Sequence, residues 1–574
     1  MLEPDSRCSV CGFDRLSICD HRHRYVDVLD GPLHVVSKLA HCMNPQCPTR
    51  GHTISPSAEL IVAPPRLSIG WDVFAWIGQR RIARDWRVPQ IREELQDSYQ
   101  IDRSEDSIER HIARYQAILA AREQDPDNLA LAYRGSSGII LSIDGLQPEK
   151  GHETLYVVRE VTEKRVWFAI PLLSSASSEI ARLFVLARDW ATRLGIPVKA
   201  WISDKQQAFV TGIADLFPGV PHRYCANHFL RDAAKPVLAL DSHAKVRMRT
   251  KVRGLREIER AVLQDCAEFA KGPAAVPPAS TPERTAELAL VPALTPAPTP
   301  ALTPALTPAP TSTLAPEPMS ALNPSTAGAV VLEYCAAVRG ILTDDQGGPL
   351  CPTGLRMADA LAQVKKSLER CTAGNIQCVE HGYFQRLAGC IDRGLAAVAV
   401  DLAIVRGHAQ TLKSIWDCLD PLTGNGESRK ASFDVLAASL RHDADPLRLH
   451  MGAVMTTFAR GLFAAPDDAQ LPIDNLDLER AFKRPKHHRR HIHGRSHAGS
   501  GLVPVGATLL PALDAHMRHR GVFSPAELAA WRNAQPPACQ RDALHRRSIT
   551  RKARSKKKRP LLLAELESRY LGDG

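Results

Sequence analysis

The chain has 574 residues, a formal net charge of +11 and fourteen cysteines. This length exceeds what one hydrophobic core supports, so several domains are expected. No run approaches roughly 18 consecutive apolar residues, and no basic stretch precedes an apolar one at the start, so we expect neither a membrane span nor a signal peptide. Without an export signal, the thiols favour metal ligation over disulfides in a cytoplasmic protein. The basic excess favours a polyanionic partner, nucleic acid before membrane.

Residues 1–60 are rich in Cys and His and predict a zinc ribbon. A Cys-x-x-Cys pair and a wider pair flank a segment that alternates like two strands around a Gly-Pro turn; the four cysteines are Cys8, Cys11, Cys42 and Cys47. Four thiolates suit tetrahedral Zn²⁺, and paired knuckles bring them together without a large core. Further residues could replace one of the four: Cys19, His21, His23 and His41. Unrelated free thiols are the alternative interpretation.

Residues 66–125 predict a helix-turn-helix that binds DNA. Two apolar helical faces follow one another, at Ile91, Leu95 and Tyr99 and then at Ile108, Ile112 and Tyr115. Ser104 is placed to cap the second helix, on which Arg110 and Arg114 are available for phosphates or base edges. A plain helical hairpin would give the same pattern.

Residues 134–240 alternate between strand-like and helical runs. Three strand-like runs come first, at Ile139–Ile143, Thr154–Val161 and Arg165–Pro171. An amphipathic helix then leads to a buried strand, "PVKAWISD", and a further helix leads to a short strand, "HRYC". The first strand ends at Asp144 and the fourth at Asp204. Each aspartate alone could be an ordinary strand-end turn residue.

This order of elements is that of the ribonuclease H-like fold, in which the first and fourth strands lie side by side. The fold would bring Asp144 and Asp204 together at one edge of the sheet. Two adjacent carboxylates are hard oxygen ligands suited to Mg²⁺ (or Mn²⁺), and a cation between them offsets their mutual repulsion. The pair therefore predicts a catalytic metal site.

The phrase "LFPGVPHRYCANHFLRD" follows Asp204 and contains a Cys-x-x-His pair, Cys225 and His228. In these residues the chain resembles DDE transposases of the Mutator-like group and related bacterial insertion-sequence enzymes. The resemblance implies that Cys225 and His228 support the catalytic core or contact the DNA end. A lone pair cannot close a tetrahedral zinc site, and a thiol is too soft for Mg²⁺. A buried cysteine with a capping histidine is the alternative.

The resemblance also implies a third carboxylate on a distant helix. In "LPIDNLDLERAFKRPKHHRRHIHGR", Asn475 and Glu479 stand four residues apart, as in the Asn-x-x-x-Glu of similar transposases. Asp474 and Asp477 compete for the role, but Asp477 lies on another helical face when Glu479 points inward. A solvated acidic face is the alternative. The basic stretch that follows is expected to neutralise DNA phosphates through Lys483, Arg484, Lys486, Arg489, Arg490 and Arg495.

The remaining boundaries follow composition. Residues 241–470 predict a helical insertion with a Pro/Ala/Thr-rich, disordered linker at 272–326. Residues 471–515 are predicted to form the last helix of the catalytic core, which carries the third carboxylate. Residues 516–574 are predicted to form a basic tail, whose run at 541–559 could be disordered or a nonspecific DNA-binding arm.

The predicted fold is therefore multidomain α+β: a zinc ribbon, a helix-turn-helix, and a ribonuclease H-like core of mixed sheet and helices, interrupted by helices. Mg²⁺ held by Asp144, Asp204 and Glu479 would cleave transposon ends and join them to target DNA. The resemblance implies terminal inverted repeats as partners, a homodimer or larger assembly on DNA, and a bacterial, nucleoid-associated location. A non-catalytic zinc-ribbon DNA-binding protein and a ribonuclease H-like nuclease are the alternatives.

Overall fold

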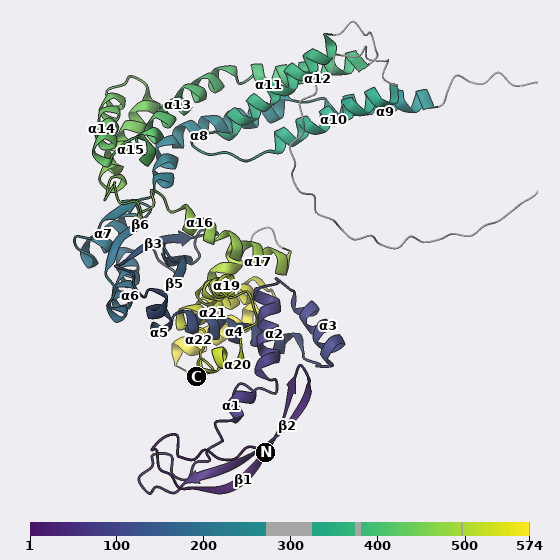
Figure 1. Ribbon diagram of the computed structural model, residues 1–574. Helices are drawn as coiled ribbons and strands as arrows, with labels where there is room; N and C mark the ends of the chain where they lie inside the picture. The colour runs from purple at the N-terminus through teal and green to yellow at the C-terminus, as the bar shows by residue number, and fades with distance from the viewer. Residues whose placement is uncertain (271–323, 374–379, 495–497, 573–574) are drawn as a thin grey trace, which may run out of the picture. The chain divides into compact units, whose positions relative to one another are not determined.

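The computed structural model describes residues 1–270, 324–373, 380–494 and 498–572 (Figure 1). Nearly all of the expected linker, and Arg495, lie outside the described residues. The chain forms two compact units, one of residues 1–233 with 414–574 and one of residues 234–413. The protein is mixed α/β, and each unit is considered separately below.

A long hairpin opens the first unit. Strand β1 (Leu16–Val28) pairs antiparallel with β2 (Gly31–Cys42), and the short helix α1 (Glu59–Val62) follows. Gly31 closes the turn at a φ of +119°, a conformation that a side chain would strain. Most of β1 is exposed. The hairpin therefore buries little apolar surface of its own.

A helical region follows the hairpin, with α2 (Trp71–Ile82), α3 (Val88–Tyr99), α4 (Glu105–Glu123) and α5 (Pro126–Ala132). The connection from α3 to α4 turns at Gln100, which has a φ of +56°, and the Ser104 side chain caps α4 by accepting from the Ser107 N–H. This is the helix pair expected at 66–125. The pair is not a separate domain, because its apolar faces share one core with the C-terminal part of the chain.

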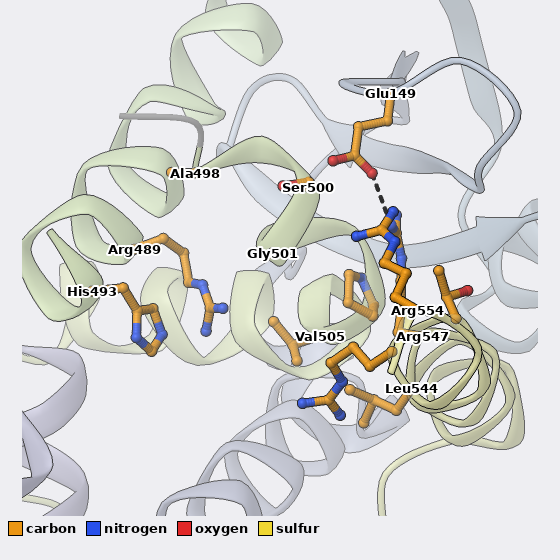
Figure 2. A pocket seen from close by; sticks show the side chains of 13 residues that line it. Glu149, Arg489, His493, Ala498, Ser500, Gly501, Val505, Leu544, Arg547 and Arg554 are labelled. Carbon is orange, nitrogen blue, oxygen red and sulfur yellow. Dashed lines mark hydrogen bonds and ion pairs between the residues drawn. The ribbon is translucent and has the colours of Figure 1, made fainter. Parts of the chain in front are cut away.

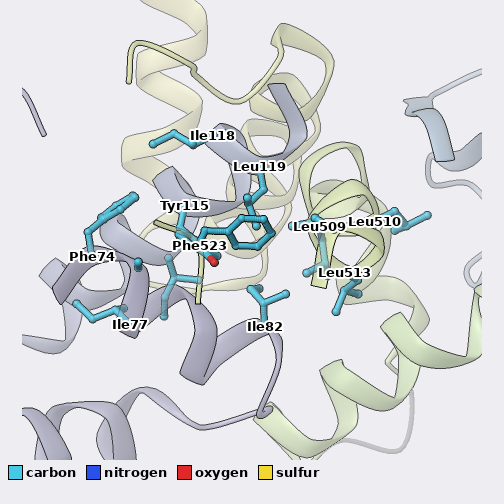
Figure 3. Close-up of a cluster of buried hydrophobic side chains, with 14 of the residues drawn as sticks. Phe74, Ile77, Ile82, Tyr115, Ile118, Leu119, Leu509, Leu510, Leu513 and Phe523 are labelled. Carbon is cyan, nitrogen blue, oxygen red and sulfur yellow. The ribbon is translucent and has the colours of Figure 1, made fainter. Parts of the chain in front are cut away.

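Figure 3 shows this shared core: Phe74, Ile77 and Ile82 of α2 and Tyr115, Ile118 and Leu119 of α4 lie with Leu509, Leu510, Leu513 and Phe523. The three leucines belong to α19 (Gly506–Arg518). The buried Tyr115 hydroxyl and Nε2 of His516 lie 2.9 Å apart, which adds a hydrogen bond between α4 and α19. Burial of this many large side chains is the main stabilisation of the region.

The sheet of the first unit has five strands: β3 (Ile139–Leu146), β4 (Thr154–Glu160), β5 (Arg165–Leu172), β6 (Val198–Ser203) and β7 (His222–Tyr224). Their order is β5-β4-β3-β6-β7; β3, β4 and β5 pair antiparallel, whereas β6 runs parallel to β3 and to β7. The crossover helices α6 (Ser177–Leu194) and α7 (Gln207–Leu216) bury Phe184 and Phe209 in the same core as Trp201 of the sheet.

The helices after the sheet divide between the two units. Helix α8 (Ala226–Lys251) contains residues of both, and the second unit also contains α9 (Leu255–Ala270), α10 (Pro324–Thr343), α11 (Thr353–Thr372), α12 (Glu380–Ala396) and most of α13 (Ala399–Asp417). The 3₁₀ turn η1 (Pro421–Thr423) and the helices α14 (Gly426–Arg441) and α15 (Pro446–Leu462) belong to the first unit. On α15, Phe458 stacks edge-on against Tyr224 of β7. The helices expected as one insertion at 241–470 thus split, because α14 and α15 pack beside the sheet.

The C-terminal region consists of α16 (Leu476–Ala481), α17 (Lys483–His493), α18 (Gly499–Leu502), η2 (Val503–Val505), α19, α20 (Pro525–Ala529), α21 (Ala538–Arg554) and α22 (Arg559–Leu571). Residues 516–574 were expected as a basic tail, but α21 is anchored to the folded unit: Gln540 is buried and hydrogen-bonded to Thr508, and Arg546 pairs with Glu153. No helix in the described parts of the chain is long and apolar enough to cross a membrane.

Candidate active site at the edge of the sheet

Asp144 and Asp204 come from two neighbouring parallel strands. Ser142 of β3 pairs with Ile202 of β6, and each aspartate follows its paired residue by two positions, Asp144 within β3 and Asp204 directly after β6. Backbone N–H groups hold one oxygen of each carboxylate: Gly145 donates to Asp144 Oδ1 at 2.7 Å, and Gln206 donates to Asp204 Oδ1 at 3.2 Å. The expectation that the two strands lie side by side is confirmed.

Glu479 reaches the same edge from α16. Its Oε1 lies 3.8 Å from His228 Nδ1, and its Oε2 lies 3.7 Å from a guanidinium nitrogen of Arg231. Both Glu479 Oε1 and His228 Nδ1 are buried and lack a hydrogen-bond partner among the described residues. An unsatisfied buried carboxylate oxygen is costly, so this atom has unused capacity for a ligand.

The three carboxylates influence one another electrostatically. Burial raises the pKa of Asp144 to about 6, and the negative charges of Asp204 and Glu479 add to the rise, although His228 opposes it. Burial likewise raises the pKa of Asp204. Desolvation and like charge both disfavour the ionised forms, which is the electrostatic situation that a bound cation reverses.

Asn475 and Cys225 fasten α16 to the sheet. The buried Asn475 side chain donates from Nδ2 to the carbonyl of Ile143, directly before Asp144, at 3.2 Å. Its backbone N–H donates to the Cys225 sulfur at 3.2 Å, while the Cys225 N–H donates to the carbonyl of Ser203, directly before Asp204, at 2.8 Å. Burial raises the pKa of the Cys225 thiol to about 11. Cys225 therefore acts as a neutral acceptor between the two strand ends and α16.

The two competing aspartates are engaged elsewhere. Asp477 forms an ion pair with the buried Arg159 of β4. Asp474 accepts from the Leu476 N–H at 3.0 Å, as in the first turn of a helix. Glu479 is the carboxylate of this segment whose charge reaches Asp144.

Three arginines of this region escaped the sequence analysis. Arg223 of β7 donates to the carbonyls of Ala464 and Leu471 and holds the loop that returns the chain toward α16. Arg159 and Arg231 pair with Asp477 and Glu479, respectively. The position of Arg231, three residues after His228 on α8, was a usable signal, because residues three apart share a helix face.

Four cysteines gather beside the hairpin, as expected. Sulfur atoms of Cys8 and Cys47 lie 3.9 Å apart and those of Cys11 and Cys42 lie 3.5 Å apart, and all four ligand atoms lie within 4.8 Å of one another. Backbone N–H groups lower the pKa of Cys8 to about 6, whereas burial raises that of Cys42 to about 12. A cluster of four convergent thiols is compatible with a structural Zn²⁺ site.

The spare ligands do not join this cluster. Cys19 is exposed, and its sulfur donates to the carbonyl of Leu39. His23 stacks on His34 across the hairpin, His21 is exposed on β1, and Nδ1 of His41 is buried without a partner among the described residues. The donor set in the structure is the one formed by Cys8, Cys11, Cys42 and Cys47.

The expected DNA-binding residues lie in different environments. Arg110 and Arg114 line a hollow of about 990 Å³, where the Arg114 guanidinium donates to the carbonyl of Arg532. Arg484 reaches the carbonyl of Ile82 at 3.4 Å. The remaining described members of the set all belong to α17: Lys483, Lys486, Arg489 and Arg490. DNA binding by these residues stays a prediction.

No protein-family model matches the chain, and no curated protein matches it either.

Proposed function

We propose that the chain is a ribonuclease H-like DNA transposase of the DDE type, with Asp144, Asp204 and Glu479 as its catalytic carboxylates. The observation that carries the proposal is that Asp144 and Asp204 follow two adjacent parallel strands, with Glu479 of a distant helix near enough for its charge to act on Asp144. The strand order, with three antiparallel strands followed by two parallel ones, supports the fold. The Cys-x-x-His pair beside the carboxylates supports the resemblance to this enzyme class.

The residues present fit Mg²⁺ (or Mn²⁺). The charges of Asp204 and Glu479 act on Asp144, burial and like charge raise the pKa of Asp144 and Asp204, and Glu479 Oε1 is a buried acceptor without a partner among the described residues. Oxygen ligands of this kind suit a hard divalent cation. When bound, such ions stabilise the attacking and leaving oxygens of a phosphoryl transfer.

The neighbouring side chains have separate tasks in this proposal. His228 lies against Glu479 and offsets the negative charge at the edge. Arg231 is half exposed beside the other Glu479 oxygen, so its guanidinium is available to a phosphate of the cleaved strand. Cys225 and Asn475 position α16 and contact no reacting atom.

The proposed reaction has two steps. Water first attacks a phosphodiester at the transposon end and releases a 3′-hydroxyl, and this hydroxyl then attacks a phosphodiester of the target and displaces its 3′-oxygen. The four-cysteine cluster, with Zn²⁺, and the α3–α4 pair would bind the terminal inverted repeats. Because two ends must meet, a homodimer or larger assembly on DNA is expected.

The test compares wild type with Asp144→Asn, Glu479→Gln and Asp477→Asn on a labelled plasmid that bears the element's own ends, in Mg²⁺. We expect the wild type and Asp477→Asn to cleave, and the other two variants to lose about a thousandfold or more, as loss of an essential electrostatic contribution does. Asp477→Asn should instead lower stability, since it leaves the buried Arg159 unpaired.

Other outcomes select the alternatives. Specific binding without cleavage by the wild type would favour a non-catalytic DNA-binding protein. Cleavage of branched DNA without strand transfer would favour a nuclease. Full activity of Glu479→Gln would remove Glu479 from the catalytic set.

A further inference from the structure

A basic pocket of about 460 Å³ lies between α17, α18, η2 and α21 of the first unit (Figure 2). Its polar lining consists of Glu149, Arg489, His493, Ser500, Arg547, Thr550, Arg551 and Arg554. Glu149 belongs to the loop that joins β3, the strand of Asp144, to β4. The pocket is separate from the carboxylate edge. Arg489 and the run 541–559 were expected to contact DNA one by one, but nothing in the sequence indicates that they line one pocket.

The contribution of α21 follows from helical spacing. Arg547, Arg551 and Arg554 stand at i, i+4 and i+7, so they share one face, and Thr550 lies on the same face. The helix is held in place by the buried Gln540 and Ala543 and by the Arg546–Glu153 ion pair. The arginine face is therefore fixed in orientation and does not belong to a loose tail.

The opposite wall contains Arg489 of α17. Gly501 adjoins its guanidinium, and a Cβ at that position would lie 2.7 Å from the Arg489 nitrogen. Any larger residue would push the guanidinium aside. Figure 2 shows Arg489 and His493 on one side of the pocket and Arg547 and Arg554 of α21 on the other.

Among the described lining residues of the pocket, arginines outnumber acidic residues. Glu149 is the only acidic residue among the described lining residues, and it is already bound by Arg547 at 2.8 Å, which lowers its pKa. Three further arginines, Arg489, Arg551 and Arg554, line the same space. Gathered like charges cost free energy that a bound oxyanion would recover, and guanidinium groups match phosphate oxygens in geometry.

We propose that this pocket binds a backbone phosphate of DNA, an inference that rests on the proposed function. The chemistry it would recognise is a phosphate oxyanion. A polymer fits better than a free anion, because the basic stretch continues past the pocket along the chain, through Lys552 and Lys556–Arg559. The α21 arginines and Arg489 of α17 would thus form one phosphate clamp beside the catalytic sheet.

The test measures binding of a fluorescent duplex to the full chain as a function of salt, without divalent metal. Arg551→Gln with Arg554→Gln should reduce the slope of log K against log salt by about 2, one for each lost phosphate contact. The control is Arg188→Gln with Arg193→Gln, which removes the same charge from exposed positions of α6 and should leave the slope unchanged. Equal slopes in both double variants would overturn the proposal.

Two further arms identify the source of the phosphate. Inorganic phosphate or pyrophosphate that binds the wild type at millimolar concentration, with no change in the DNA slope of the α21 variant, would make the pocket a free-anion site and reject the DNA proposal. The Asp144→Asn variant separates this proposal from the proposed function, because it should keep the wild-type slope while losing cleavage. If the Arg551→Gln, Arg554→Gln variant binds DNA with the wild-type salt slope, and the wild type still cleaves DNA with metal, only the pocket proposal is rejected.

Discussion

The four-cysteine cluster and the carboxylate edge are both candidate metal sites, but they relate to the fold in opposite ways. All four cysteines lie between residues 8 and 47, on the flanks of a hairpin whose buried apolar set is small. The three carboxylates come from residues 144 to 479, two from the sheet and one from α16, and the sheet has a large core of aromatic and aliphatic side chains.

This difference shows that one site stabilises the fold around it, whereas the other is held in place by the fold. At the hairpin, a metal would supply the stability that the small core lacks, so the fold would depend on the ligands. At the sheet edge, the core and the contacts of Asn475 and Cys225 hold mutually repelling carboxylates together. There the site depends on the fold, and loss of one carboxylate should leave the structure intact.

The largest expected effect is loss of order at the hairpin when the cysteine cluster is broken. Structural zinc sites in small domains contribute about 10–16 kcal/mol of binding free energy that is also folding free energy. Cys42→Ala, or removal of Zn²⁺ by a chelator, should abolish hydrogen-exchange protection in β1 and β2 while the sheet β3–β7 keeps its own. Cys19→Ala is the matched control and should retain the metal content and the protection, because its thiol is exposed and turned away.

Protection of β1 and β2 that survives metal removal would contradict this dependence. The residual core around Val26, Val35 and Ala63 would then be enough to hold the hairpin. Such a result would remove the contrast between the two sites.

Local patterns were sufficient for much of the fold. The paired cysteines, the order of strands and the two aspartates at strand ends are short-range features, because spacing along the chain fixes them. The exclusion of Cys19 could not be read in the same way. It depends on a register shift between Ile18 and Asp20, which sets the direction of the neighbouring side chains.

Long-range packing accounts for what the sequence did not reveal. The helices of residues 66–125 share their core with α19 and Phe523, and helical periodicity says only that a face is apolar, not what covers it. Asn475 and Glu479 were expected on one helix face. Asn475 is the N-cap of α16, and its carbonyl accepts from the Glu479 N–H at 3.1 Å. What the sequence did not reveal is that its side-chain amide bonds to Ile143, a contact between segments far apart in the chain.

The next effect concerns the contact between α15 and β7, which holds the returning chain against the sheet. A Cβ on Gly461 of α15 would lie 2.2 Å from the ring of Tyr224, the residue before Cys225. Gly461→Ala should therefore destabilise the first unit by about 1–3 kcal/mol through overpacking, measured by urea unfolding. Gly407→Ala is the control: it lies in helix α13 with open space around it, so it should be neutral or slightly stabilising.

A Gly461→Ala variant as stable as the wild type would mean that Tyr224 can move without cost. The carboxylate edge would then be less firmly built than its contacts suggest. The contrast with the hairpin would then be smaller, because the fold would hold the carboxylate edge less firmly.

The last prediction separates two kinds of cysteine. Cys225→Ala removes the acceptor of the Asn475 N–H and should cost about 1–3 kcal/mol, the range for a buried donor left unsatisfied. Its metal content should equal that of the wild type, since the neutral Cys225 thiol has a pKa of about 11 and faces a backbone donor. Metal analysis beside urea unfolding tests both parts. Metal lost from this variant, with stability unchanged, would make Cys225 a ligand together with His228 and Glu479, whose ligand atoms are close enough to share an ion. Stability lost at constant metal content would instead show that Cys225 positions α16. Cysteine sulfur would then bind a metal at the hairpin and accept a hydrogen bond at the sheet, because the surroundings of the thiol differ between the two sites.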